Sequence, residues 1–167
     1  MHAPPRDRRY QRRPREARLL PSGVAEAREL DEMIRAALAP MPRVAAAWVF
    51  GSMARGDAGP RSDLDVAVLP RAELGRDDII ALRELAGRLE AFSPSGAVDV
   101  LVLGPQGPVL RHRILREGRL VHDADAETRI AYEGRTIAEY LDWKPTHDIA
   151  MRSALSGIRD RLKRAAS

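Results

Sequence analysis

The 167-residue sequence contains no cysteine, which excludes a disulfide framework and a thiolate metal site. Any metal ion must therefore be held by oxygen or imidazole ligands. Aromatic residues make up only 4% of the chain against 44% hydrophobic residues, so the core is expected to consist mainly of Ala, Val, Leu and Ile. No apolar run approaches the roughly 18 residues that a membrane-spanning helix needs. We expect one folded domain located in the cytoplasm, with no membrane partner.

The charge is unevenly distributed along the chain. The net charge is +4, a value that by itself favours a nucleic-acid partner. Residues 1–22, however, hold seven arginines and two acidic residues, a net of +5, which leaves −1 for residues 23–167. A segment rich in Arg and Pro is typical of a disordered extension, with nucleic-acid contact or a start codon placed too far upstream as the alternatives. We therefore expect a basic disordered extension over 1–22 and a domain over 23–167 for which nucleic acid is an improbable partner.

Hydrophobic periodicity predicts alternating helices and strands in the first two thirds of the domain. Apolar residues recur at helical spacing after Ser22 until Pro40 and Pro42, whereas short apolar runs bounded by turn residues predict strands. The predicted elements are a helix ending near Leu38, a strand over 44–50, a strand over 63–69, a helix over 77–91 and a strand over 97–103.

The remaining third is predicted to be largely helical. Leu110 and Ile114 indicate one short helix, residues 128–141 another, and the C-terminal helical segment covers about 125–167. Met151, Leu155, Ile158 and Leu162 follow one another at spacings of four, three and four along a terminal helix. Either packing against the sheet or a partner protein accounts for this stripe, because periodicity does not distinguish the two. The fold class is α/β (α+β), with a small mixed sheet flanked by helices and additional C-terminal helices.

Two carboxylates lie close together at the start of the second predicted strand. Asp63 and Asp65 are separated by one residue, and side chains alternate along a strand, so both point to the same face. Two neighbouring carboxylates repel each other, and a divalent cation is the simplest species that relieves the repulsion. Oxygen ligands select a hard ion such as Mg²⁺.

A third carboxylate lies in the third predicted strand. Asp99 is on the face opposite Val98 and Val100, in an otherwise apolar segment where a lone carboxylate needs a partner. If this strand lies beside the 63–69 strand, Asp99 completes a cluster able to hold two metal ions about 4 Å apart.

The turn after the first predicted strand has the features of a phosphate-binding segment. Gly51 lets the backbone approach a phosphate closely, the Ser52 hydroxyl is a hydrogen-bond donor, and a helix opening at Met53 presents backbone N–H groups. Arg55, one turn further on, either neutralises phosphate charge or is a solvated surface arginine.

Taken together, the segment GSMARGDAGPRSDLDVAV resembles the signature of polymerase-β-like nucleotidyltransferases, which is Gly-Ser, ten residues, then Asp-x-Asp. The resemblance implies a nucleotidyltransferase fold, Asp63, Asp65 and Asp99 as catalytic and metal-binding residues, and Gly51 and Ser52 as nucleotide-binding residues. Two Mg²⁺ ions and a nucleoside triphosphate follow from the same resemblance.

Two later segments, VLRHRILREGRLVHDAD and EYLDWKP, are similar to those of MntA-type antitoxins, minimal nucleotidyltransferases paired with HEPN-domain toxins. This similarity implies transfer of AMP from ATP to a tyrosine of an RNA-cleaving HEPN toxin. Alternatives stay open. Within the same enzyme class, the acceptor is an aminoglycoside-like hydroxyl or an RNA 3′ end. In a different class, the protein is an antitoxin that inhibits by binding alone.

Overall fold

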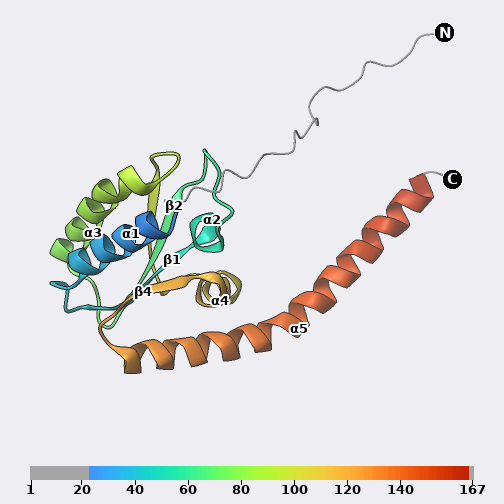
Figure 1. Ribbon diagram of the computed structural model, residues 1–167. Helices are drawn as coiled ribbons and strands as arrows, with labels where there is room; N and C mark the ends of the chain where they lie inside the picture. The colour runs from blue at the N-terminus through green and yellow to red at the C-terminus, as the bar shows by residue number, and fades with distance from the viewer. Residues whose placement is uncertain (1–22, 166–167) are drawn as a thin grey trace, which may run out of the picture.

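The computed structural model describes residues 23–165, with side chains described for 25–145. The extension expected over residues 1–22 and the side chains of the Met151–Leu162 stripe lie outside the described residues. Figure 1 shows a sheet wrapped by helices, from which the last helix extends outward.

A four-stranded mixed sheet with the order β3-β2-β1-β4 forms the centre of the domain. The central strand β1 pairs antiparallel with both β2 and β4, and β2 pairs parallel with β3. Apolar residues fill β1 because helices cover both of its faces. The strands are β1 (Val44–Phe50), β2 (Leu64–Pro70), β3 (Val98–Val102) and β4 (Arg119–Asp123).

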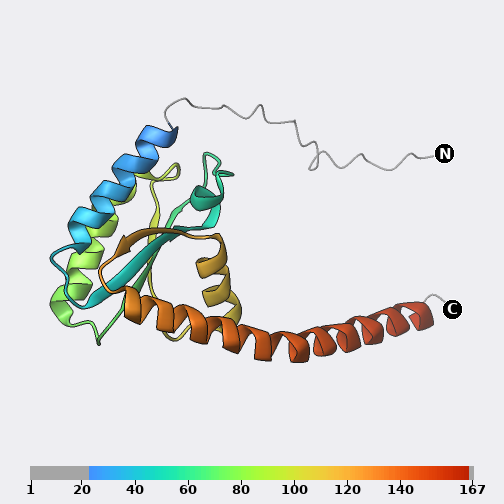
Figure 2. The ribbon, with the colours of Figure 1, turned by 60° about the horizontal axis from the view of Figure 1, so that its bottom comes forward.

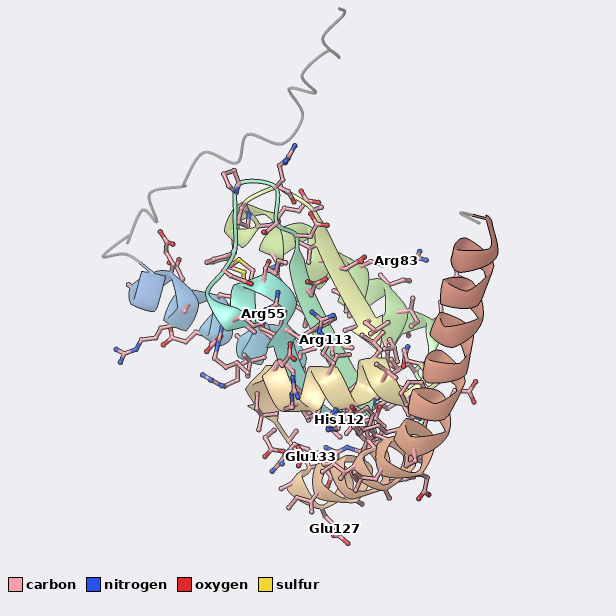
Figure 3. The ribbon with its side chains drawn as sticks, turned by 90° about the vertical axis from the view of Figure 1, so that its right-hand side faces the viewer. Arg55, Arg83, His112, Arg113, Glu127 and Glu133 are labelled. Atoms are coloured by element: carbon pink, nitrogen blue, oxygen red, sulfur yellow. The ribbon has the colours of Figure 1, made fainter. Side chains whose placement is uncertain are left out.

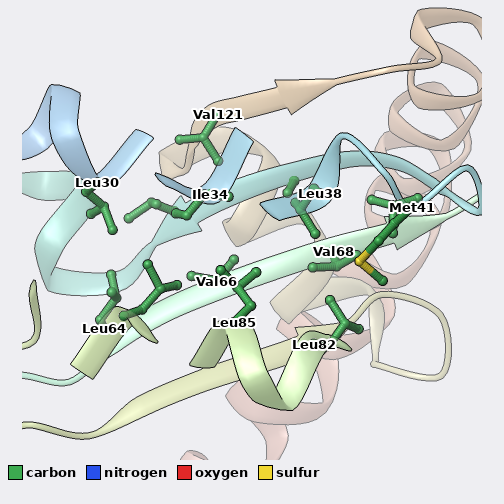
Figure 4. Close-up of a cluster of buried hydrophobic side chains, with 14 residues drawn as sticks. Leu30, Ile34, Leu38, Met41, Leu64, Val66, Val68, Leu82, Leu85 and Val121 are labelled. Carbon is green, nitrogen blue, oxygen red and sulfur yellow. The ribbon is translucent and has the colours of Figure 1, made fainter. Parts of the chain in front are cut away.

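Helices α1 (Gly23–Leu38) and α3 (Arg76–Leu89) cover one face of the sheet. The core beneath them is aliphatic, as the low aromatic content predicts, and Figure 4 shows its side chains meeting between the helices and the strands. A short 3₁₀ helix, η2 (Glu90–Phe92), leads from α3 toward β3. The fully or almost fully buried members of this core include Leu30, Ile34, Leu38, Val49, Val66, Val68, Leu82, Leu85 and Leu89.

Helices α4 (Pro108–Glu117) and α5 (Ala126–Ala165) cover the opposite face (Figure 2). Ile114 of α4 and Tyr132 of α5 pack there against Trp48 and Ala67 of the sheet. The short helix α2 (Gly51–Arg55) stands at the end of β1 and contacts α4. The domain is therefore a three-layer α/β structure in which α2 and α4 meet at one end of the sheet.

Strand β4 corrects the expectation that the chain after residue 103 is largely helical. Gly118 ends α4 by donating its N–H to the Ile114 carbonyl at 2.8 Å, and the chain then pairs with β1. Only Val121 and His122 of this strand are buried, while Leu120 is 40% exposed. The segment is too short and too weakly patterned to predict a strand, and its pairing with β1 is a long-range interaction.

Helix α5 corrects a second expectation, because the two helices predicted after residue 125 form one 40-residue helix. Pro145 lies inside it, where proline removes a backbone hydrogen bond and bends a helix. Figure 1 shows that α5 changes direction part-way along its length. Neither α5 nor any other helix in the described part of the chain has the length and apolarity needed to cross a membrane.

Asp125 caps the N-terminus of α5, and its replacement by alanine is expected to lower the melting temperature by about 2–4 °C. Its side chain accepts hydrogen bonds from the Thr128 N–H at 3.0 Å and the Thr128 hydroxyl at 2.8 Å. The Thr128 backbone bond contributes most to lowering the pKa of Asp125 below its ordinary 3.8. The stabilisation that ionised Asp125 gives the folded chain is therefore present above pH 3.8. It is lost as the pH falls through the lower pKa that Asp125 has in the folded state. Thermal unfolding at pH 7 and in strong acid checks this, with Asp125→Asn, which retains a capping oxygen, as control.

Candidate functional site

Asp65 and Asp99 are neighbours on adjacent strands. Parallel pairing of β2 and β3 sets Asp65 opposite Asp99 in register, between the pairs Leu64–Val98 and Val66–Val100. Adjacent strands lie about 4.8 Å apart, so the two carboxylates occupy the same edge of the same face. The adjacency on which the three-carboxylate prediction depended is therefore present.

Asp63 precedes β2 and lies toward the solvent. Its Oδ1 atom accepts a hydrogen bond of 2.6 Å from the Ser95 hydroxyl, in the turn before β3. A backbone bond from the Ser95 N–H to the Ser62 carbonyl, at 3.2 Å, ties the same two segments together. The β3 turn thus holds Asp63 as well as Asp99 near Asp65, and Ser95 is a site residue that the sequence analysis did not identify.

Gly51 begins α2 directly after β1 and contacts Asp65 closely. Its φ of 71° lies in the left-handed region, which residues with a Cβ rarely adopt. A methyl group built at this position would overlap the Asp65 Oδ2 atom. Only glycine therefore satisfies both the backbone conformation and the space, which connects the Gly51-Ser52 turn physically to the Asp-x-Asp motif.

A cavity of about 270 Å³ opens beside this turn. One side is formed by the end of β1 and by α2, with Asp65 of β2, and the other side by α4. Its lining residues are Phe50, Gly51, Ser52, Arg55, Asp65, Leu110, Arg113 and Glu117. Four of the six residues predicted to act at the site, namely Gly51, Ser52, Arg55 and Asp65, line this cavity, while Asp63 and Asp99 flank Asp65 outside its lining.

Charges of both signs meet at Asp65. Burial is the main cause that raises the pKa of Asp65, and repulsion by Asp99 and then by Asp63 raises it further. Arg55 and Arg113 act in the opposite direction and lower it. Figure 3 shows these two arginines between α2 and α4. The site therefore combines crowded carboxylates with two nearby cations.

The donor set fits a hard divalent cation. In residues 25–145 no three acidic or histidine side chains converge closely enough to enclose an ion as they are oriented. The Asp63 carboxylate accepts the Ser95 hydrogen bond in this orientation. All three aspartates nevertheless offer oxygen ligands from one edge of the sheet, and a cation would relieve the repulsion that raises the pKa of Asp65.

Residues 32–127 match the model of the family described as polymerase beta, nucleotidyltransferase. The chain belongs to this family. The match covers more than half of the chain and includes both the Gly51-Ser52 turn and the three aspartates. The nucleotidyltransferase class and fold expected from the sequence are thereby confirmed. Among proteins of curated function, none matches this nucleotidyltransferase in sequence.

Several solved structures that resemble the nucleotidyltransferase are toxin–antitoxin complexes. A toxin–antitoxin crystal structure with AMP-PNP is 23% identical with a TM-score of 0.59, covering 75% of this chain and 98% of the other. An MntA–HepT complex is 21% identical with a TM-score of 0.56, covering 77% and 98%. A third structure, a tri-AMPylated Shewanella oneidensis HEPN toxin in complex with an MNT antitoxin, is 20% identical with a TM-score of 0.54. The match covers 80% of this chain and 98% of the other. At these identities the likeness establishes the shared fold.

Arg113 and Glu117 are site residues of the nucleotidyltransferase that the sequence analysis missed. With Leu110 they stand at spacings of three and four on α4, so one face of this helix carries all three into the cavity. That spacing is visible in the sequence, but nothing local indicates that the face meets α2.

Proposed function

We propose that this nucleotidyltransferase transfers AMP from ATP to a hydroxyl group of a HEPN-domain toxin and thereby acts as its antitoxin. The observation that carries the proposal is the pairing of Asp65 with Asp99 beside a cavity bordered by Gly51 and Ser52. Carboxylates next to a phosphate-sized recess suit phosphoryl-group chemistry, in which positioning and charge neutralisation supply most of the rate.

In this mechanism Gly51, Ser52 and Arg55 bind the outer phosphates of ATP. The acceptor oxygen attacks the α-phosphorus, the bond from that phosphorus to the bridging oxygen breaks, and pyrophosphate leaves. Asp99, which is exposed at the edge of the sheet, accepts the proton of the acceptor hydroxyl. Asp63, Asp65 and Asp99 would hold Mg²⁺, which neutralises phosphate charge and lowers the pKa of the attacking hydroxyl when bound.

Exposed apolar side chains on α5 favour a protein acceptor. Ile130, Ile137 and Leu141 are 59%, 46% and 59% exposed, and their spacings of seven and four place them on one face of the helix. An unpartnered apolar face of this kind is typical of a protein-binding surface. The solved relatives with bound HEPN toxin agree with this choice, and their AMP-PNP and tri-AMPylated states agree with ATP as the donor.

Two other functions remain to be separated by experiment. An aminoglycoside-like acceptor uses the same site but leaves the α5 face without a role. Inhibition by binding alone leaves the in-register carboxylates without a role, although it explains the α5 face equally well.

Toxin inactivation at low dose tests the proposal. A small amount of this protein is incubated with a tenfold molar excess of a purified HEPN-domain ribonuclease, ATP and Mg²⁺, and is then removed. We expect each modified toxin to gain one or more AMP units in mass and to stay inactive against RNA, since a bulky anion at the ribonuclease centre repels the RNA backbone. A binding module protects only while it is bound. Unchanged toxin mass together with recovered cleavage contradicts the proposal, and a kanamycin reaction run in parallel tests the small-molecule acceptor.

A further inference from the structure

Helix α4 brings one arginine, Arg113, to the cavity on the side opposite the Gly51-Ser52 turn. Arg113 lines the cavity and is near enough to Asp65 to lower the pKa of that carboxyl. Arg55 of α2 lines the same cavity from the other side. A cavity with a phosphate-binding turn on one wall and a guanidinium on the facing wall suits an anion that spans the gap.

Glu117 ties the two arginines together. Its Oε2 atom lies 3.3 Å from Nε of Arg113 and 3.6 Å from an Nη atom of Arg55, so one carboxylate oxygen serves both. Its Oε1 atom lies 2.7 Å from Arg116. Glu117 is only 22% exposed, which is far less than Arg113 at 58% or Arg116 at 68%. A half-buried carboxylate thus joins the cavity arginines of two different helices.

The geometry of the Arg113 pair leaves its outer nitrogens for a ligand. Glu117 contacts Arg113 at Nε, at the base of the guanidinium, so the two terminal NH₂ groups lie further along the side chain and remain available to a planar, bidentate partner. Arg55, by contrast, also contacts the Asp57 carboxylate through its Nε and Nη2 atoms, at 3.3 Å each. Arg113 is therefore the cavity arginine with more donor capacity for an incoming anion.

We infer that Arg113 binds the triphosphate of the nucleotide from the α4 side, and that Glu117 is a positioning residue that fixes Arg113 and Arg55 across the cavity. The inference rests on the proposed function, because it takes ATP as the donor. It adds a second wall to the phosphate site, contributed by a helix outside the Gly-Ser and Asp-x-Asp motifs. The ligand class is a polyphosphate, recognised by charge-assisted hydrogen bonds from a guanidinium.

Calorimetric titration of α,β-methylene-ATP in the presence of Mg²⁺ tests the role of Arg113. Arg113→Gln is expected to weaken binding about tenfold, and inorganic tripolyphosphate is expected to lose affinity by a similar factor, since the contact is to phosphate and not to the nucleoside. Arg116→Gln is the matched control. Arg116 contacts the same carboxylate but does not line the cavity, so its removal should change the affinity less than twofold.

Coupling between the two residues tests the positioning role. Glu117→Gln alone should weaken binding about threefold to tenfold, yet add much less when introduced into Arg113→Gln, because Glu117 acts largely through Arg113. Arg113→Lys, which retains the charge but lacks the Nε contact, should resemble Glu117→Gln. Additive losses, or full rescue by lysine, would show that Glu117 does not position Arg113.

The outcomes separate this inference from the proposed function. If the Arg113→Gln variant binds the ATP analogue as tightly as the wild type does, the inference about Arg113 is wrong and the proposed function is unaffected. The expected binding pattern together with no AMP transfer to a HEPN protein overturns the proposed acceptor and leaves the inference standing. Thermal unfolding of each variant without ligand confirms that the titrated protein is folded.

Discussion

Replacing Asp65 with asparagine is expected to reduce nucleotide transfer more than about 100-fold while the protein stays folded. Asparagine keeps the shape of the side chain but removes the charge that lies opposite Asp99 and beside the Gly51 turn. The measurement is transfer of labelled AMP in the presence of Mg²⁺. Asp77→Asn, the same substitution at an exposed position in the first turn of α3, is the control and should retain full activity.

The same variant is expected to be at least as stable as the wild type at neutral pH. Burial, Asp99 and Asp63 raise the pKa of Asp65 above its ordinary 3.8, so the ionised side chain destabilises the folded chain more than the unfolded one. This destabilisation is absent below pH 3.8, where Asp65 is protonated in both the folded and the unfolded chain. It develops as the pH rises from 3.8 toward the higher pKa that Asp65 has in the folded state. A melting temperature that falls clearly on substitution at pH 7 would contradict this account, and retained activity would remove Asp65 from the site.

Replacing Gly51 with alanine is expected to cause a loss of activity of similar size, together with a loss of stability. An L-residue in the left-handed conformation costs roughly 1–2 kcal/mol, and the added methyl group must also displace the Asp65 carboxylate. AMP transfer and chemical unfolding of the variant measure the two effects separately.

Gly56→Ala separates backbone strain from the displacement of Asp65. Gly56 has a φ of 74°, almost the same as Gly51, but a methyl group there meets no atom within 4 Å. This control should lose comparable stability and keep its activity. Equal activity of the two variants would mean that contact with Asp65 is unimportant.

Local patterns predict much of this structure because its main signals lie within short segments. The apolar run Val44–Phe50 ends at a glycine, and β1 has those bounds. The one-residue spacing of Asp63 and Asp65 predicts that both carboxylates face the same way, because side chains alternate along a strand, and this prediction needs no long-range information. Asp99 is different, because its proposed role requires β3 to be adjacent to β2, and no residue near Asp99 specifies that adjacency. The register that pairs it with Asp65 becomes visible only in the folded sheet.

Interactions between distant segments account for what the sequence did not reveal. Strand β4 depends on its pairing with β1. Arg113 and Glu117 join the site because Ile114 packs α4 against the face of the sheet opposite α1 and α3. The hydrophobic periodicity predicted two helices after residue 125, whereas one helix continues through Pro145. The family model fixes the enzyme class, while the acceptor depends on surfaces that the motif residues do not describe.

Helix α5 also determines how the molecule moves in solution. At a rise of 1.5 Å per residue its 40 residues extend about 60 Å, whereas a compact chain of this length has a radius of gyration of about 15 Å. Figures 1 and 2 show the far half of the helix projecting beyond the body of the domain. Such a rod increases frictional drag without adding mass. The 18.5 kDa monomer should therefore elute early from a sizing column, at the position of a larger globular protein, so that light scattering is needed to distinguish a monomer from a dimer.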